Sequence, residues 1–467
     1  MPLHIITAVL NYIWLAFLLI AVIVGGFSGT LPALTKGAFE TAEMAVMKIA
    51  LPLVGIMAIW LGIMRLAERA GLVKLIARAL APVMRRLFPD VPPDHPAMGS
   101  MVMNIAANML GLGNAATPLG LRAMADLETL NRQPGVATNA MCTFLAINTA
   151  SIQLVPTTAI GLLAIAGSKN PTAIVPTAFL ATCCALSCGV LSAKILEKLP
   201  MFRLAPPSGA TSSDRERDET TASQVATPVE VEKIDPPPVT FFGKCLLCVF
   251  GLCFAAMFMM LAFPAAASAA GSIFGLTLPA SPPELGDKGP VIRSLFAISI
   301  LAVPFLLSFF PLYAALRGVK VYEQFVEGAR EAFAVAQRII PFLVAMLVSI
   351  SMLRHAGVID AMTRVLGPAL AWIGFPADLL PMVLMRPLSG SATQGIFVEL
   401  INRIGPDNLI SQMAATIYGS TETTFYVLAV YFGAVAIRQT RHAVIAGLIA
   451  DTTAVIASIA ICRAVLG

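Results

Sequence analysis

The stretch Tyr418-Gly-Ser-Thr-Glu-Thr-Thr-Phe425 surrounds one carboxylate, Glu422, with small hydroxyl residues. Apolar residues flank it on both sides, over 413–417 and 427–436. An acidic side chain inside a membrane costs about 2.5–3.5 kcal/mol on insertion scales unless it faces a cavity or a partner. If these flanks cross a membrane, Glu422 is a candidate functional residue. In the alternative interpretation, a protonated Glu422 only bonds a neighbouring hydroxyl.

The composition of the whole chain indicates a membrane location. Of its 467 residues, 58% are hydrophobic and 12% are charged, whereas soluble domains carry about 25% charged residues. Few segments alternate with the period of two that a transmembrane β-barrel requires. The sequence therefore predicts an all-α polytopic membrane protein. The net charge of +5 is modest, and basic residues beside apolar segments reflect membrane topology, so no nucleic-acid partner is expected.

Patterns typical of an enzyme are missing from the sequence. Cys245-Leu-Leu-Cys248 has CxxC spacing, but no second CxxC and no nearby histidine accompanies it, so a metal site is not predicted. The chain has no GxxxxGK[ST] phosphate-binding loop, and its four histidines are scattered over loops and segment ends. We therefore expect no enzymatic activity, no catalytic residues, no metal and no bound cofactor.

The apolar segments predict the order of the elements. Two segments with helical amphipathic spacing, 66–88 and 358–372, are expected to lie in the interface plane. The segment 66–88 contains many more basic residues than 358–372. The alternative interpretation of 66–88 is a helix of the kind that calmodulin binds. Conventional membrane spans, each near the 20 residues that a bilayer requires, are expected at about 7–27, 44–64, 172–196, 240–267, 291–316 and 332–353.

Two further apolar segments are interrupted by polar residues. The segment 98–130 is broken at 111–120, and each of its arms is too short to cross a bilayer alone, which favours a re-entrant hairpin. Two full crossings are the alternative. The segment 136–166 is broken at 148–153, which contains Asn148-Thr-Ala-Ser-Ile-Gln153. Non-helical backbone at this depth is tolerated where it lines a cavity.

A polar stretch divides the chain into two halves. Residues 201–239 are rich in Pro, Ser, Thr, Asp and Glu and nearly free of large apolar residues, which is typical of a disordered linker. The predicted domains are a first repeat over 1–199, a linker over 200–239 and a second repeat over 240–467.

The second half repeats the first half in the same order. Arg69-Ala-Gly-Leu-Val73 resembles His355-Ala-Gly-Val-Ile359, and Pro82 answers to Pro368. The break at 116–118 corresponds to 392–394, and Asn148-Thr-Ala-Ser151 corresponds to Ser420-Thr-Glu-Thr423, so that Ala150 stands opposite Glu422. The positive-inside rule places the N-terminus, the Arg-rich segment 66–88 and the linker in the cytoplasm. On this count the repeats are inverted, each with a re-entrant hairpin, a broken helix and an interfacial amphipathic helix.

Inverted repeats with broken helices are the usual plan of secondary transporters, with the substrate near the midplane where these helices meet. We therefore expect four polar segments to converge on one site. The alternative is that their hydroxyls and amides only join helices to one another. The candidate substrate- and ion-binding residues are Asn114, Thr117, Asn148, Thr149, Ser151, Gln153, Ser391, Thr393, Gln394, Ser420, Thr421, Glu422 and Thr423.

Two other ionisable residues, Arg386 and Asp451, are expected deep in the membrane. Pairing of Arg386 with Glu422 or Asp451 would satisfy both charges, and loss of that pairing during a transport cycle would make it a gate. Asn104 and Asn108 lie four apart on one face of the first hairpin arm and are expected to serve packing.

The polar breaks carry a family resemblance. The segment 104–120, Asn-Ile-Ala-Ala-Asn-Met-Leu-Gly-Leu-Gly-Asn-Ala-Ala-Thr-Pro-Leu-Gly, resembles the spore maturation protein A family. Arg386-Pro-Leu-Ser-Gly-Ser-Ala-Thr393 and the segment 418–430 resemble the spore maturation protein B family. The chain thus resembles a fusion of the two, within the nucleoside-recognition (Gate) superfamily, which is similar to concentrative nucleoside transporters and the membrane part of ferrous iron transporter B.

The resemblance implies a transporter-like fold, linked in spore formers to maturation. Nucleoside transporters have a Gly-Gln-Thr-Glu-Ala-Pro-like motif, which Gly419-Ser-Thr-Glu-Thr-Thr424 resembles except at Ser420 and Thr424. From residues and resemblance together, we expect a multi-pass protein of the cell (inner) membrane that carries a small polar solute, nucleoside-like or otherwise, with Na⁺ or H⁺ as coupling ion. Its expected partners are that solute, the lipid bilayer and other copies of itself in a homo-oligomer. The alternative is a non-transporting scaffold or assembly factor in envelope or spore maturation.

Overall fold

The computed structural model describes residues 3–111, 113–202, 237–265, 268, 289–372 and 374–467. These ranges are almost entirely helical and contain no strand apart from an isolated bridge between Val136 and Gln439. The helices of the first half are α1 (Leu3–Phe27), α2 (Leu31–Met44), the π-helix η1 (Ala45–Ala50), α3 (Leu51–Arg69), α4 (Leu72–Leu87), α5 (Pro96–Met109), α6 (Gly113–Glu128), α7 (Asn139–Ala150), α8 (Thr157–Ile165) and α9 (Ile174–Leu196). Those of the second half are α11 (Phe241–Ala262), α13 (Pro290–Leu316), α14 (Val321–His355), α15 (Val358–Trp372), α16 (Leu380–Met385), α17 (Gly390–Ile404), α18 (Leu409–Ser420), α19 (Thr424–Ala434) and α20 (Ala443–Val465).

Five of the described helices are long and apolar enough to cross a membrane, and α14, bent by 40° near its middle, is a sixth candidate. The chain is therefore the all-α multi-pass membrane protein that its composition predicts. Most of the predicted linker, 203–236, lies outside the described residues, so its disorder stays a prediction.

The second predicted span starts earlier than expected. Helices α2, η1 and α3 form one continuous helical segment of 39 residues, Leu31–Arg69. Lys36 and Glu40, assigned from the sequence to a connecting segment, lie on its surface and approach each other to 3.8 Å. Because exposed charges at i and i+4 are compatible with a helix, they do not end it. The span expected at 332–353 likewise begins earlier, at Val321.

The elements from α3 to α9 recur in the same order from α14 to α20. The matching Ala-Gly pairs have a structural cause, since Gly71 and Gly357 adopt φ angles of +80° and +78°. This left-handed conformation suits glycine and ends a helix. In both halves it ends the long helix and lets the amphipathic helix leave in a new direction.

Equivalent helices of the two halves pack against each other in antiparallel directions. Along α2–α3 and α14, Thr41 contacts Ser351, whereas Gly62 lies against Phe325. Gly189 of α9 lies against Ala450 of α20, and Ala193 clusters with Ala446. Such an arrangement is compatible with inverted repeats. Their orientation relative to a membrane stays a prediction.

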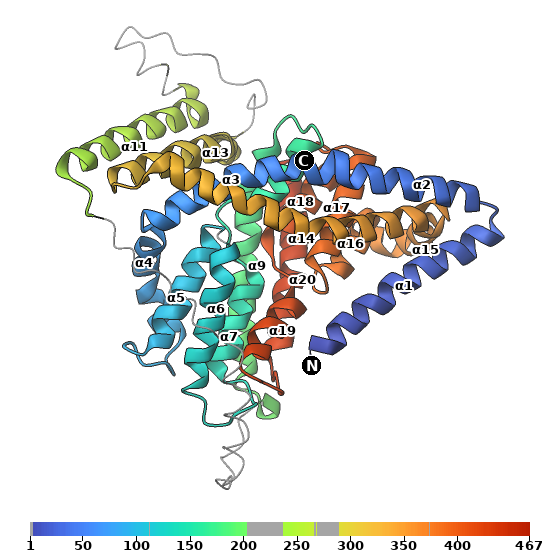
Figure 1. Ribbon diagram of the computed structural model, residues 1–467, viewed down its shortest axis with the longest axis horizontal. Coiled ribbons are helices and arrows are strands. Elements are labelled where there is room, and N and C mark those ends of the chain that lie inside the picture. The colour runs from blue at the N-terminus through green and yellow to red at the C-terminus, as the bar shows by residue number, and fades with distance from the viewer. Residues whose placement is uncertain (1–2, 112, 203–236, 266–267, 269–288, 373) are drawn as a thin grey trace.

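The helices form a bundle crossed by two long helices (Figure 1). Helices α4, α5, α6, α7 and α9 follow one another across the bundle, and α20 packs on α9. The long segment α2–α3 and helix α14 run together over one end of the bundle, and α11 pairs with α13 at its edge. The core below the crossing contains residues of both halves, among them Met101, Phe144 and Phe432.

The loop after each hairpin contacts the loop after the broken helix of the other half. The Gly135 carbonyl accepts hydrogen bonds from the backbone N–H groups of Arg438 and Gln439, at 2.8 and 3.0 Å. In the other pair, the Asp407 carboxylate accepts from the Ser168 hydroxyl at 2.6 Å and from the backbone N–H of Lys169 at 3.2 Å. The two halves are therefore joined at both ends of the bundle by related contacts.

The first of these junctions is held by Arg441. Its guanidinium donates to the carbonyls of Ala137 and Phe202 and to the side chain of Asn139, which fastens the start of α7 to the start of α20. The neighbouring His442 is buried against the ring of Phe202. Burial, with Arg441 and then Lys194 nearby, lowers the pKa of His442 to about 4, so this imidazole is neutral at pH 7.

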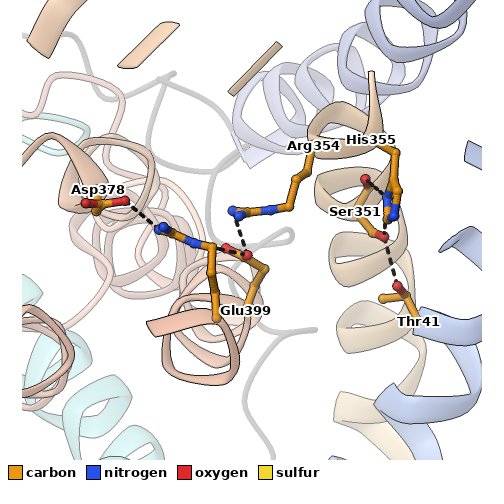
Figure 2. A network of polar contacts seen from close by, with 7 residues as sticks. Thr41, Ser351, Arg354, His355, Asp378 and Glu399 are labelled. Carbon is orange, nitrogen blue, oxygen red and sulfur yellow. Dashed lines mark hydrogen bonds and ion pairs between the residues drawn. The ribbon is translucent and has the colours of Figure 1, made fainter. Parts of the chain in front are cut away.

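An ion-pair network ties the second hairpin to α14 (Figure 2). Arg354, near the end of α14, contacts Glu399 of α17 at 2.6 Å. Arg403 contacts Glu399 at 3.7 Å and Asp378 at 2.5 Å. On the other side of α14, the Thr41 hydroxyl donates to the Ser351 hydroxyl at 2.9 Å. Helix α14 thus links the α2 segment to the hairpin.

We expect Glu399→Gln to lower the free energy of unfolding by about 1–3 kcal/mol, because it leaves two half-buried guanidinium groups without their shared carboxylate. The measurement is unfolding of the purified protein in detergent. Glu323→Gln is the matched control, since Glu323 pairs with Lys320 at 3.1 Å but both side chains are mostly exposed, and such pairs contribute at most about 1 kcal/mol. Equal stability of the two variants would contradict the role of the network.

Candidate functional site

Both broken helices unwind at the predicted polar residues. In the second half, α18 ends at Ser420 and α19 begins at Thr424, which leaves Thr421 to Thr423 outside the helices. In the first half, α7 ends at Ala150 and α8 begins at Thr157. Ser151, the first residue of that break, has a φ of +36°, a value that few residues other than glycine adopt. Such strain is concentrated at functional sites.

Each break contacts the helix end that leads into the other break. The backbone N–H of Glu422, in the second break, donates at 2.8 Å to the carbonyl of Thr149, in the last turn of α7. A Cβ atom on Gly419, in the last turn of α18, would lie 2.5 Å from the Cβ of Pro156 in the first break, so only glycine permits this approach. The two broken helices are therefore in contact beside Glu422, whose side chain is half-buried.

The second hairpin closes on the second break through Arg386. This side chain is 4% exposed and donates to the carbonyls of Tyr418 and Thr421. Its guanidinium also lies 5.0 Å from the centre of the Tyr418 ring. The structure contains no ion pair between Arg386 and either acid, so the pairing considered from the sequence is not made in this conformation. Arg386 instead satisfies carbonyls that the break leaves free.

The first hairpin contacts the first broken helix and α19, in two cases through asparagines. The Asn108 amide donates to the Asn148 side-chain oxygen at 2.9 Å, and the Leu154 N–H donates to the Met109 carbonyl at 3.0 Å. Asn104 donates to the Tyr431 hydroxyl at 3.3 Å. Asn104 and Asn108, expected to serve packing, therefore connect the hairpin to site residues by hydrogen bonds.

Tyr431 of α19, in the second half, hydrogen-bonds to and packs against residues of the first half. Its hydroxyl donates to the Asn148 side-chain oxygen at 3.4 Å and accepts from Asn104. The ring stacks on Phe144 with centroids 6.0 Å apart. The hydroxyl lies directly over Gly120 of α6, where a Cβ would collide with it.

We expect Gly120→Ala to lower the free energy of unfolding by roughly 1–3 kcal/mol, because overpacking of a close contact forces neighbours from their positions. The measurement is unfolding in detergent. Gly99→Ala is the control, since a Cβ there would meet no atom within 4 Å. A Gly120→Ala variant as stable as the Gly99→Ala variant would show that Tyr431 is not held as described.

Asp451 of α20 contacts the start of α19, next to the second break. The Thr424 hydroxyl donates to Asp451 at 2.5 Å, which joins the first turn of α19 to α20. The Thr182 hydroxyl of α9 donates to the Ser420 carbonyl at 2.8 Å. Helices α9 and α20 thus each hold one end of the second break by a hydrogen bond.

Several buried polar atoms near these contacts have no hydrogen-bond partner in the part of the chain that the structure describes. They are the Ser151 hydroxyl, Nε2 of Gln394, Nε of Arg386 and Oδ1 of Asp451. A buried polar atom without a partner costs about 1–3 kcal/mol, and such atoms are uncommon. Unpartnered buried atoms also occur elsewhere in the described chain, for example in Gln412 and His442. Those of Ser151, Arg386 and Asp451 lie at or beside the breaks, where a polar ligand could satisfy them.

A cavity of about 170 Å³ lies beside the first break. It extends from α3 to the tip of the first hairpin at Gly111 and to the start of α8. Apolar side chains, including Trp60 and Met57, form most of its wall, and Thr157 and Thr158 supply hydroxyl groups. The cavity therefore has one apolar side and one polar end.

The predicted site residues fall into three groups. Glu422 is bonded to Thr149, Asn148 to Asn108 of the first hairpin, and the Thr421 carbonyl to Arg386, while Thr423 lies against Gly390 of the second hairpin. Other residues are bonded within their own segments: Thr393 bonds the Ser389 carbonyl, Ser391 contacts the Ser389 hydroxyl, and the Ser420 hydroxyl bonds the Ile417 carbonyl at 3.2 Å. The described contacts do not link Thr393 or Gln394 to the breaks. The remaining positions are Ser151 and Gln153 in the first break, Thr117 in α6, and Asn114 in α6, whose side chain lies outside the described residues.

Tyr431 and Thr182 were not predicted as site residues. Neither neighbours a break in sequence, and each lies on a helix with other hydroxyl residues, such as Thr177 in α9 and Tyr426 in α19, so nothing on those helices distinguished them. The pair of asparagines four residues apart was the available signal for Tyr431, because two amides on one apolar face need partners.

The fold and site together define a class, that of multi-pass membrane proteins built from two related halves that meet at broken helices. The family model described as Gate, nucleoside recognition, matches residues 50–166 and 336–438. Each matched range runs from a long helix through a hairpin to a broken helix. The chain belongs to the Gate nucleoside-recognition family.

Two curated relatives are similar to different halves of the chain. Spore maturation protein A of Bacillus subtilis (strain 168) is 43% identical over 165 residues, which are 35% of this chain and 84% of that protein. Spore maturation protein B of the same organism is 43% identical over 170 residues, which are 36% of this chain and 96% of that protein. The predicted resemblance to a fusion of these two proteins is thereby confirmed. No solved structure matches the chain.

Proposed function

We propose that this protein is a secondary transporter, or flux pathway, for a small polar solute in the cell (inner) membrane. The observation that carries the proposal is the hydrogen bond from the Glu422 N–H to the Thr149 carbonyl, which joins the unwound second break to the last turn of α7, directly before the first break. Unwound backbone at membrane depth is tolerated where it lines a cavity or a substrate pathway. Enzymatic chemistry is not part of this proposal.

The chemical character of the site suggests how a solute would be held. Thr149 and Thr421, together with Thr117 and Thr393, would line the site, and Glu422 would bind the solute or a proton. The unpartnered atoms of Ser151 and Asp451 would bind polar groups of the solute or a partly dehydrated cation. We propose Na⁺ or H⁺ as the coupling ion, since freed carbonyls and carboxylates bind both.

The cavity beside the first break, whose walls do not include Thr149, Thr421 or Glu422, bears on the size of a solute that enters there. A volume of about 170 Å³ is close to the roughly 150 Å³ that holds benzene in an engineered cavity and is below the roughly 300–1,000 Å³ of pockets for drug-sized ligands. A ring that stacks near Trp60 with a polar edge toward Thr157 fits this space. The family description, nucleoside recognition, makes nucleobases and nucleosides the first solutes to try, with further opening needed for a nucleoside.

The test is a ligand screen by thermal shift, with and without Na⁺, followed by uptake into liposomes that contain only this protein. A ligand at 100 times its dissociation constant stabilises the native state by about 2.7 kcal/mol, which is readily measured. Saturable uptake of the same compound supports the proposal. Saturable binding with no flux in either direction, under Na⁺ or pH gradients, would overturn it.

The second candidate is a non-transporting scaffold or assembly factor in envelope or spore maturation. The observation in its favour is that both relatives are named for spore maturation and not for transport. Saturable uptake by the protein alone would exclude it.

A further inference from the structure

Helix α4 presents three different faces. Its buried residues, Leu72, Val73, Ala77 and Met84, belong to the same core as Met98 and Met101 of α5. Its exposed residues divide by helical spacing into a basic strip and an apolar strip. The basic strip consists of Lys74, Arg78 and Arg85, and the apolar strip consists of Leu75, Ala79 and Val83, with Arg86 at its C-terminal end.

The apolar strip is unusual for a surface exposed to water. Leu75 and Val83 are 50% and 59% exposed although they share the outer surface of α4 with arginines. A helix in the membrane interface combines these features, because its apolar side enters the acyl region while its basic residues reach the headgroups.

The position of α4 along the chain agrees with such a surface. A candidate membrane span ends at Arg69, and α4 begins at Leu72. The left-handed turn at Gly71 directs α4 away from the axis of α3 (Figure 1). If α3 crosses the membrane as a span, the first turn of α4 lies at the end of that span, within reach of phospholipid headgroups.

The arginines of α4 have no protein partner that would account for them. No ion pair joins Arg78, Arg85 or Arg86 to an acidic residue in the part of the chain that the structure describes. The equivalent helix of the second half, α15, has the same place in the repeat but carries a single arginine, Arg364. The basic strip is therefore not a requirement of the fold.

We propose that α4 is a binding surface for anionic phospholipids, with Arg78, Arg85 and Arg86 contacting the phosphate groups and Leu75 and Val83 contacting acyl chains. Clusters of basic residues on amphipathic helices next to a membrane span recognise anionic headgroups in this way. Because the buried face of α4 packs on α5, bound lipid would also brace the first hairpin. The proposal is independent of what the protein transports.

The test compares the association of spin-labelled phosphatidylglycerol and phosphatidylcholine with the full-length protein in liposomes. Each basic residue near an anionic surface strengthens attraction roughly fivefold at low salt. The triple variant Arg78→Gln, Arg85→Gln, Arg86→Gln is therefore expected to lower the ratio of the two association constants at least about tenfold, after screening by salt. The triple variant with lysine at the same positions should keep most of the ratio.

The matched control is the triple variant Arg122→Gln, Arg132→Gln, Arg364→Gln, which removes three exposed arginines elsewhere and should leave the ratio unchanged. The unfolding midpoint in neutral detergent checks that each variant is folded. A ratio within twofold of the wild-type value in the glutamine variant would overturn the proposal and favour a protein partner for α4. Equal losses in the glutamine and lysine variants would also overturn it, since charge would then not be the cause.

Discussion

Glu422→Gln is expected to abolish solute uptake while the protein still inserts and folds. The bond from the second break to α7 uses the backbone N–H of Glu422, which glutamine retains. The side chain keeps its size but loses the charge that would bind a proton, a cation or a polar solute. Loss of one hydrogen bond to a charged group, about 1.5–3 kcal/mol, corresponds to at least a tenfold lower rate, and loss of the coupling proton or cation would remove transport altogether.

The measurement is initial uptake into proteoliposomes of a solute already shown to be transported by the wild type. Glu40→Gln is the matched control, since Glu40 lies in another candidate span but is 66% exposed and pairs only with Lys36. Normal uptake by the Glu422→Gln variant would remove Glu422 from the mechanism. Lost uptake with a much lower unfolding midpoint would show a structural role instead, as in the alternative of a buried, protonated acid.

Arg386→Met is expected to have the largest effect on stability. The methionine fills similar space but leaves the carbonyls of Tyr418 and Thr421 without the guanidinium that donates to them. At about 1–3 kcal/mol for each buried acceptor left unpaired, the free energy of unfolding should fall by about 2–5 kcal/mol. Part of that loss is offset, because a buried guanidinium no longer has to be desolvated.

The conservative variant Arg386→Lys separates charge from geometry. Lysine keeps the charge but cannot reproduce the planar fork that reaches both carbonyls, so an intermediate stability is expected, measured by unfolding in detergent. Arg293→Met in α13, a half-buried arginine away from the breaks, serves as the comparison. If Arg386→Met were as stable as that comparison, the contacts of Arg386 with the second break would not hold the hairpin in place.

The asymmetry between the repeats is explained by packing. Ala150, which aligns with Glu422, is fully buried in a cluster with Ala185, Ala450 and Ala454. That position has room for a methyl group only, so the first half cannot carry a second carboxylate there. The half-buried side chain of Glu422 is not confined in this way, which leaves a single acid at the junction of two similar breaks.

Composition was sufficient for the membrane class, because the 12% of charged residues cannot cover a soluble domain of this size. The breaks were also predictable, since a polar interruption in an apolar segment changes the local balance between helix and unwound backbone. The repeat could be recognised from Gly71 and Gly357 because both end a long helix in a left-handed turn. Such a turn favours glycine wherever it occurs. Helix starts were less predictable, because exposed charges such as Lys36 do not stop a helix.

The Tyr418–Phe425 stretch separates what the sequence predicts from what only the tertiary structure decides. Its composition and its apolar flanks already predict that Glu422 is an acidic side chain whose placement in a membrane costs free energy. Only the tertiary structure places the Thr149 carbonyl opposite its N–H group, turns Arg386 toward backbone carbonyls and not toward an acid, and brings Tyr431 over Gly120. These contacts join residues from separate helices, and their partners depend on how the two halves pack, which no local pattern in the chain encodes.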